Sequence, residues 1–241
     1  MLQLHPDKVQ LWFAFCDEIA EQSLLADYRR LLVDEERQKE ARFHFARDRH
    51  RYLITRALVR TVLSRYASVM PQDWRFAEDT YGRPQIVNDH AAARRISFNV
   101  SHTSSLVVLG VSCERALGVD TEDVQTRRAD LQIADHYFSV DEVTQLRATP
   151  PELQQARFFE YWTLKESYIK ARGFGLALPL GDFAFKLNPP GPPEITFEPA
   201  LEDDPRTWQF LQDWPTPQHR LGLAVRREGS DLPVRLRFVT P

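Results

Sequence analysis

Long apolar runs are absent from this chain of 241 residues, and cysteine is scarce, with only two present. A membrane-spanning helix needs about 18 or more consecutive apolar residues, so we expect no membrane segment and no membrane partner. The first residues, MLQLHPDKVQLWF, lack a basic stretch followed by an apolar one, so we expect no secretory signal. Together these absences predict a soluble, cytoplasmic protein.

The two cysteines, Cys16 and Cys113, lie in apolar, strand-like stretches and lack metal-ligand spacing. One disulfide between them is an open alternative. Two buried free thiols are the better interpretation, because disulfides are rare in a reducing cytoplasm and free cysteine is commonly buried.

Positive charge is concentrated early in a chain whose net charge is −3. Residues 29–65 contain eleven Lys or Arg and five Asp or Glu. This block favours an anionic partner such as nucleic acid, an acidic protein or a phosphorylated small molecule, with a solvated helix face as the alternative. Because the rest of the chain is acidic and no recognition motif is present, we expect no nucleic-acid partner.

Hydrophobic periodicity predicts a mixture of helices and strands. Helices are expected at 23–32, 34–45, 52–65, 131–148 and from Pro150-Pro151 to Gly173. Strands are expected at 9–15, 96–100, 106–111, 116–122, 183–187, 208–211, 221–225 and 234–238. On the helix at 52–65 we expect Arg56 and Arg60 to lie opposite the apolar, core-facing side.

The two halves of the chain share a rough sequence pattern. The tripeptide VDE occurs at 33–35 and 140–142, and ARF follows at 41–43 and 156–158. The unequal spacing makes this a weak sign of duplication. We expect an α+β fold, a pseudo-twofold pair of similar α/β subdomains (residues 1–112 and 113–241) with the active site in the cleft between them.

Two carboxylates follow an apolar strand in the second half. Asp120 and Glu122 alternate, so both side chains leave the same face of the strand. Adjacent carboxylates repel each other and favour a cation between them, and ligands that are all oxygen suit Mg²⁺. A solvated pair of acids at a strand end is the alternative.

A third carboxylate is offered by the stretch WTLKESYIK at 162–170. On a helix Glu166 and Lys170 share one side, whereas Lys165 points roughly 100° away from Glu166. Taken alone, Glu166 and Lys170 are most simply an i,i+4 surface pair. With Asp120 and Glu122, Glu166 completes a set of three metal-ligating carboxylates.

Three further segments carry groups that bind anions. Ser101 and His102 follow a strand, Arg83 lies in the turn YGRP, and Arg47 lies in FARD. Each is individually weak, because a structural histidine or a surface arginine is the commoner case. The combination is far more specific than its parts.

In this order the motifs resemble those of Sfp-type 4′-phosphopantetheinyl transferases. The matching segments are FARD (45–48), YGRP (81–84), FNVSH (98–102), GVDTE (118–122) and WTLKESYIK (162–170). The length suits the two-subdomain branch of that family. The resemblance implies transfer of phosphopantetheine from coenzyme A to a serine of an apo carrier protein, with release of adenosine 3′,5′-bisphosphate.

The resemblance also implies roles for individual residues. Asp120, Glu122 and Glu166 would hold Mg²⁺, with Mn²⁺ as an alternative, and Glu166 would act as base directly or through a water. The other implied groups contact phosphate and adenosine: Lys170, Lys165 and His102 in catalysis, and Arg47, Arg51, Lys39, Arg83, Ser101, His102 and Lys170 in binding coenzyme A. The implied partner is an acidic, helical acyl or peptidyl carrier protein, and the enzyme itself is expected to be a monomer.

Two positions depart from the family pattern. Arg83 stands where some relatives have lysine, and Glu36 stands at a position that is basic in the family. Glu36 therefore implies a different grip on the 3′-phosphate. Phe174, Leu176 and Leu178 are candidates for the carrier docking surface, with a role in closing the core equally open.

Two other functions remain open on the residues alone. A Mg²⁺-dependent pyrophosphohydrolase acting on coenzyme A or a related nucleotide would use the same carboxylates. A scaffold protein without turnover would not need the intact set of Asp120, Glu122, Glu166 and Lys170, which argues against that interpretation.

Overall fold

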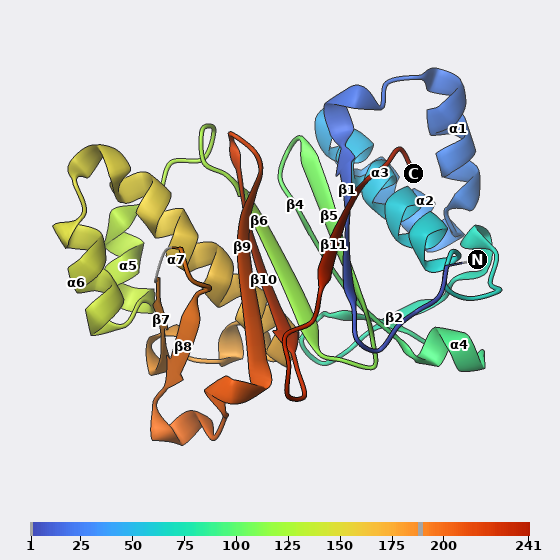
Figure 1. Ribbon diagram of the computed structural model, residues 1–241. Coiled ribbons are helices and arrows are strands. Elements are labelled where there is room, and N and C mark those ends of the chain that lie inside the picture. Colours follow the sequence, from blue (N-terminus) through green and yellow to red (C-terminus); the bar gives the residue numbers. More distant parts are fainter. Residues whose placement is uncertain (1, 188–189) are drawn as a thin grey trace. The chain divides into compact units, whose positions relative to one another are not determined.

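The computed structural model describes residues 2–187 and 190–241, and of Leu176 only the backbone. The chain forms two compact units, one of residues 1–114 with 233–241 and the other of residues 115–232 (Figure 1). The expected boundary at 112/113 lies two residues before the observed one. The last nine residues, expected in the second subdomain, belong to the first unit, because their strand pairs with the N-terminal strand.

The first unit contains a four-stranded sheet in the order β11-β1-β5-β4. Its strands are β1 (Val9–Phe15), β4 (Ile96–His102), β5 (Leu106–Cys113) and β11 (Val234–Phe238). Strand β5 is antiparallel to both β1 and β4, and β11 is parallel to β1. A short hairpin of β2 (Phe76–Glu78) and β3 (Pro84–Ile86) accompanies the sheet.

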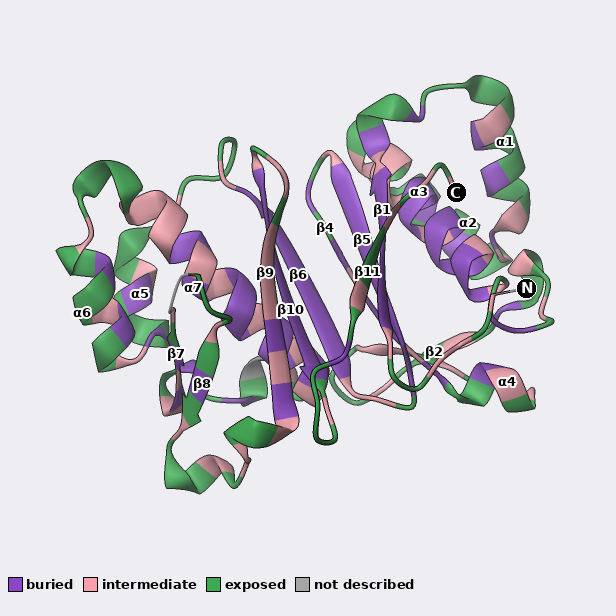
Figure 2. Ribbon diagram, in the orientation of Figure 1, coloured by how far each residue is buried: buried purple, intermediate pink, exposed green. Residues whose placement is uncertain are grey.

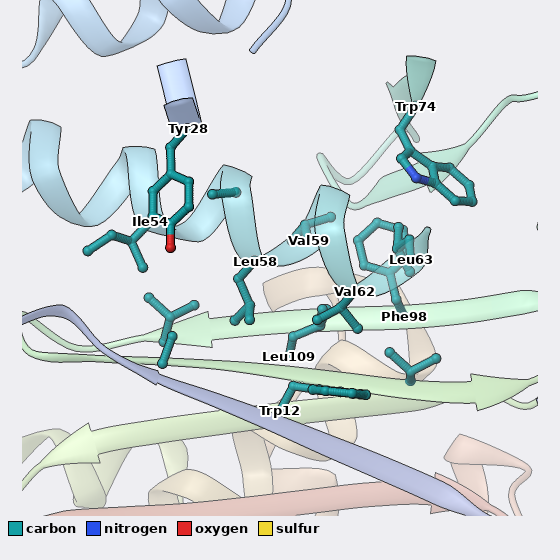
Figure 3. Packing of buried hydrophobic residues seen from close by; sticks show 14 of the residues in the cluster. Trp12, Tyr28, Ile54, Leu58, Val59, Val62, Leu63, Trp74, Phe98 and Leu109 are labelled. Carbon is teal, nitrogen blue, oxygen red and sulfur yellow. The ribbon is translucent and has the colours of Figure 1, made fainter. Parts of the chain in front are cut away.

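Four helices complete the first unit: α1 (Gln22–Leu31), α2 (Asp34–Arg42), α3 (Ala46–Leu63) and the short α4 (Ala91–Arg94). Apolar side chains of α3, among them Leu58 and Val62, point toward the strands, where Trp12 and Leu109 lie (Figure 3). Burial of this apolar surface is the main favourable contribution to folding of the unit.

The second unit is built on a three-stranded antiparallel sheet in the order β6-β10-β9. Its strands are β6 (Leu117–Asp123), β9 (Trp208–Thr216) and β10 (His219–Arg226), beside a small hairpin of β7 (Phe183–Lys186) and β8 (Glu194–Phe197). Its helices are α5 (Leu131–Tyr137), α6 (Val140–Ala148) and α7 (Pro151–Arg172). Figure 2 shows exposed outer faces on α5 and α6 and a largely buried C-terminal half of α7.

Helix α7 packs on β6 and β10, and two glycines set how closely it approaches. A Cβ atom at Gly118 would lie 2.1 Å from the Ser167 carbonyl oxygen, and one at Gly222 would lie 2.4 Å from that of Thr163. Any larger residue at these positions would push the helix away from the sheet. The helix begins at Pro151 and ends before Gly173, which adopts a left-handed conformation with φ 76°.

The expected fold class and the two free cysteines are confirmed. The fold is α+β with two units, each carrying one long helix against its sheet, and most predicted strands and helices are present. The expected helix at 131–148 is instead two helices, α5 and α6, and the one expected at 52–65 begins at Ala46. Cys16 and Cys113 are free and buried. Within the described residues no helix is long and apolar enough to span a membrane.

Candidate functional site

The acidic face of β6 is the starting point of the candidate site. Asp120 and Glu122 lie opposite Gly222 and Arg220 of β10 and share a face with Gly118, which contacts α7. Both carboxylates are largely withdrawn from water, with Asp120 5% and Glu122 8% exposed. Strand alternation thus delivers two buried carboxylates beneath the helix.

Helix α7 brings the other two groups to the same place. Lys170 donates from Nζ to Asp120 Oδ1 at 2.6 Å and to the Val119 carbonyl oxygen at 3.2 Å. Glu166 lies one turn earlier on the same side of the helix, close enough for Asp120, Glu122 and Lys170 all to influence its titration. The four residues form one cluster within the second unit.

The cluster contains more negative charge than its surroundings favour. Burial, and then the nearby Asp120 carboxylate, raise the pKa of Glu166 to about 7, while Lys170 opposes the shift. Burial and Asp120 also raise the pKa of Glu122, against the effect of Arg127. Raised pKa values of this kind mark a place where an added cation is stabilising.

Arg127, in the segment after β6, is a residue that the motifs did not single out. Its Nη1 donates to Glu122 Oε1, and its guanidinium lies 6.0 Å from the centre of the Trp162 ring. The available signal was a cation five residues after the second acid, in a turn that returns over the strand end.

The donor set suits Mg²⁺, because all its ligating atoms are carboxylate oxygens. As they stand, no His, Cys, Asp or Glu side chains in the described part of the chain form a ready group of three around one ion. Lys170 lies on Asp120 and Arg127 on Glu122, so an ion would replace these cations at the carboxylates. The residues fit the metal by chemistry and charge, with a rearrangement of side chains.

Lys165 lies elsewhere, in the core of the second unit. Its side chain is fully buried, its Nζ is 2.8 Å from Glu142 Oε2, and it donates to the carbonyl oxygens of Leu180 and Phe183 at 2.8 and 2.7 Å. With its three hydrogens committed to these acceptors, Lys165 does not face the carboxylate cluster. The expectation that it contacts phosphate is therefore corrected.

The expected phosphate-binding residues of the first unit are spread over several elements. Lys39 is an exposed residue of α2 that lines a cavity of 490 Å³ together with Arg56 and Arg75. Arg47 and Arg51 belong to the first turns of α3 and are not part of that lining; Arg47 is exposed. Arg51 pairs with Asp48 at 3.1 Å.

Arg83 and the end of β4 supply the remaining expected groups. Asp79 Oδ1 accepts from the backbone N–H of Tyr81 and Arg83 at 2.9 and 3.0 Å, which organises the predicted turn around Gly82. Burial lowers the pKa of Arg83, and Asp79 opposes that shift. On β4, Ser101 is buried and His102 is exposed.

These groups belong to the first unit and the carboxylate cluster to the second. That they meet in a cleft between the subdomains stays a prediction.

The departure at Glu36 has a structural explanation. Its carboxylate accepts from Arg60 Nε at 2.9 Å and from Arg56 Nη2. Arg60 is only 1% exposed and also donates to the Pro71 and Trp74 carbonyl oxygens, so the expectation that it lies on the solvent side of α3 is wrong. Two cations of the basic block therefore pair with Glu36 within the unit.

The three candidates for a docking surface have different outcomes. Phe174 is 39% exposed, whereas Leu178 is buried in the core of the second unit. The side chain of Leu176 lies outside the described residues.

Comparison with known proteins identifies the family. Residues 116–224 match the 4′-phosphopantetheinyl transferase superfamily, and residues 20–114 match the 4′-phosphopantetheinyl transferase N-terminal family. The chain is 33% identical over 211 residues to the 4′-phosphopantetheinyl transferase HetI of Nostoc sp., an alignment covering 88% of this chain and 84% of HetI. The chain belongs to the 4′-phosphopantetheinyl transferase family.

A second member of this family, Sfp of Bacillus subtilis, is 36% identical over 157 residues, which are 65% of this chain and 67% of Sfp. The resemblance expected from the motifs is thereby confirmed. Among solved structures the likeness is slight. The holo-acyl-carrier-protein synthase of Neisseria meningitidis is 18% identical with a TM-score of 0.38, over 47% of this chain and 98% of that one.

Proposed function

We propose that this phosphopantetheinyl transferase moves the 4′-phosphopantetheine group of coenzyme A onto a serine hydroxyl of an apo carrier protein. Adenosine 3′,5′-bisphosphate is the other product. The observation that carries the proposal is the cluster of Asp120, Glu122, Glu166 and Lys170 in a chain of this family.

Asp120, Glu122 and Glu166 are the residues that would hold Mg²⁺, or Mn²⁺ in its place. The ion supplies charge neutralisation at the pyrophosphate oxygens when bound. Phosphoryl transfer depends mainly on positioning and on such neutralisation, so buried carboxylates with raised pKa values suit this role.

Glu166 is the proposed base. The serine hydroxyl oxygen forms a bond to the β-phosphorus of coenzyme A, the bond from that phosphorus to the bridging oxygen breaks, and the hydroxyl proton passes to Glu166 directly or through a water. Lys170 stabilises the negative charge on the transferring and leaving phosphates, because its ammonium already lies among the carboxylates.

In this proposal the first unit binds the phosphates of coenzyme A. Arginine suits the 3′-phosphate and pyrophosphate because its planar guanidinium binds two oxygens at once. The proposed contacts are Arg47, Arg51, Lys39, Arg83, Ser101 and His102. Lys165 is left out of the reacting groups because it is buried against Glu142.

The test is a mass measurement on a panel of apo acyl, peptidyl and aryl carrier proteins, incubated with the purified chain, coenzyme A and Mg²⁺. We expect a phosphopantetheine adduct on at least one carrier, dependent on the metal. No adduct on any carrier would contradict the proposal. Cleavage of coenzyme A without a carrier would instead favour a pyrophosphohydrolase.

A further inference from the structure

A buried carboxylate outside the candidate site holds the end of the helix that carries Glu166 and Lys170. Asp203 lies in the segment between β8 and β9, and its side chain is 4% exposed. Its Oδ2 accepts from Tyr168 Oη at 2.8 Å, from Arg172 Nη1 at 2.5 Å and from Trp208 Nε1 at 2.9 Å. One oxygen atom thus ties the last turns of α7 to the start of β9.

The anchor and the reacting groups occupy opposite sides of α7. Tyr168 and Arg172 are four residues apart and share one side, as do Glu166 and Lys170. The two pairs are offset by two residues, or about 200° around the helix axis. Whatever fixes the side that carries Tyr168 and Arg172 therefore fixes where Glu166 and Lys170 point.

Apolar packing does not by itself fix the rotation of the last turns of α7. Gly118 and Gly222 set the distance between α7 and the sheet, and apolar contacts of Tyr168 with Phe183 and Trp208 are not directional. A rotation of about 20° would move a side-chain tip, roughly 5 Å from the axis, by nearly 2 Å. Directional contacts resist that rotation at two places: those of Lys165 with Glu142, Leu180 and Phe183, and, nearer the C-terminal end, the three hydrogen bonds that converge on Asp203.

The backbone before Asp203 is held in a costly conformation. Glu202 adopts a left-handed conformation with φ 46°, which is uncommon for a residue other than glycine. Such conformations persist where the surrounding contacts require them. Here the turn at Glu202 presents Asp203 to Tyr168, Arg172 and Trp208.

We propose that Asp203 is a positioning residue of the transferase site, which sets the rotation of the last turns of α7 and so aims Glu166 and Lys170 at the carboxylates of β6. The inference rests on the proposed function. Buried ionic contacts often add little net stability, and their better-attested use is to select one arrangement among similar ones. Asp203 touches neither substrate nor metal in this role.

The experiment compares Asp203→Ala with Gln209→Ala in the full chain. Gln209 is the matched control, because it also makes two side-chain hydrogen bonds in this unit, both to the backbone of Leu232 and neither to α7. The readouts are the thermal midpoint, the affinity for Mn²⁺ alone by electron paramagnetic resonance, and kcat and KM for an accepted carrier.

We expect Asp203→Ala to weaken Mn²⁺ binding by about 10-fold, as loss of a residue that supports metal ligands does. We expect kcat to fall by about 100-fold, the scale of a displacement near 1 Å, with KM for the carrier within about 3-fold. Gln209→Ala should lower the thermal midpoint and leave Mn²⁺ affinity and kcat near wild type. If Asp203→Ala behaves like Gln209→Ala in Mn²⁺ affinity and in kcat, Asp203 only stabilises the fold and the proposal is overturned.

Two gentler variants cover the case in which Asp203→Ala does not fold. Asp203→Asn keeps an oxygen that accepts from Tyr168 and Trp208 but removes the charge facing Arg172, and Tyr168→Phe removes one donor. Both should give intermediate losses of Mn²⁺ affinity and kcat, and wild-type values in both would contradict the proposal. If the wild-type chain transfers nothing, the proposed function fails, while Mn²⁺ affinity still decides whether Asp203 positions the carboxylates.

Discussion

The two units share one arrangement, in which a glutamate on a short helix pairs with a buried cation on the next long helix. Each places a glutamate in the first turn of a short helix, Glu36 in α2 and Glu142 in α6, and each glutamate accepts from the backbone N–H three residues earlier. Each also binds a buried cation on the next long helix, Arg60 of α3 or Lys165 of α7. The arrangement is repeated, but the VDE pattern does not mark it, because Glu142 is the last residue of VDE at 140–142 whereas Glu36 follows VDE at 33–35.

The units differ in the residue that follows this buried cation in the sequence. In the second unit Lys165 forms an ion pair with Glu142. The next residue, Glu166, faces other carboxylates and has a raised pKa. In the first unit the buried Glu36 pairs with two arginines, Arg56 and Arg60. The comparison separates the residue that fixes the helix from the residue proposed to react, although the two are adjacent in sequence.

The largest expected effect comes from Glu166→Gln, which removes the carboxylate that distinguishes α7 from α3. We expect turnover to fall by about 100- to 10,000-fold, the range for loss of a general base, while the fold stays intact. The measurement is the initial rate of carrier modification, with circular dichroism and the thermal midpoint as checks of folding. Glu152→Gln, an exposed change in the first turn of the same helix, is the control and should leave the rate unchanged. A wild-type rate in Glu166→Gln would remove Glu166 from the mechanism.

Removing the glutamate from either buried ion pair should destabilise the protein, and the free energy of unfolding should depend on pH differently in the two variants. Glu142→Gln and Glu36→Gln each leave a buried cation without its counter-charge, and we expect each to cost about 3–5 kcal/mol at pH 7. Arginine stays charged at any accessible pH, whereas burial already lowers the pKa of Lys165. Raising the pH should therefore restore part of the stability of Glu142→Gln, because the folded state then favours neutral Lys165, and should not restore Glu36→Gln.

Urea unfolding at pH 7 and at a pH near 9.5 measures this difference. The double variant Glu142→Leu with Lys165→Met is the control, since it removes both charges of the pair and should therefore lack the pH dependence expected of Glu142→Gln. The same pH dependence in Glu142→Gln and Glu36→Gln would show that Lys165 keeps its charge when it loses Glu142.

Much of the site could be predicted from the sequence because it follows from periodicity. Alternation on β6 placed Asp120 and Glu122 on one face, and the spacing of Glu166 and Lys170 placed both on one side of α7. Pro151 and Gly173 marked the ends of that helix correctly.

Long-range partners could not be predicted in this way. A helical wheel gives the direction of Lys165 or Arg60 but not what lies there. Glu142 is brought to Lys165 by α6, and the Pro71 and Trp74 carbonyl groups reach Arg60 from a segment without periodicity. Asp203 lies in an irregular segment, so its contacts with α7 are visible only when the fold is known.

A smaller effect on stability is expected when Glu166, in the carboxylate cluster, gains or loses its proton. Glu166 has a pKa of about 7 in the folded chain against an ordinary value of 4.5, so the folded state binds this proton more tightly than the unfolded state. The free energy of unfolding should therefore fall as the pH rises from 4.5 to 7, by at most about 3–4 kcal/mol, and then level off. Above pH 7 the ionised carboxylate is the form that binds metal.

Mg²⁺ should consequently raise the thermal midpoint more at pH 8 than at pH 5.5. Differential scanning fluorimetry with and without Mg²⁺ at these two pH values measures the effect, and Glu166→Gln should abolish most of the difference. An equal gain at both pH values would mean that metal binding does not compete with this proton.

The smallest expected effect concerns Arg127, the cation that neither the motifs nor the shared arrangement explains. Its side chain is 54% exposed and the side chain of its partner Glu122 is 11% exposed, so the pair resembles a surface ion pair worth up to about 1 kcal/mol. Because Arg127 would compete with a metal ion for Glu122, Arg127→Ala should tighten Mn²⁺ binding by about 2- to 5-fold, the equivalent of such a pair. Arg128→Ala, at the next exposed arginine, is the matched control and should change the affinity little. Weaker Mn²⁺ binding in Arg127→Ala would show that Arg127 supports the arrangement of Glu122 and does not compete with the metal ion for it.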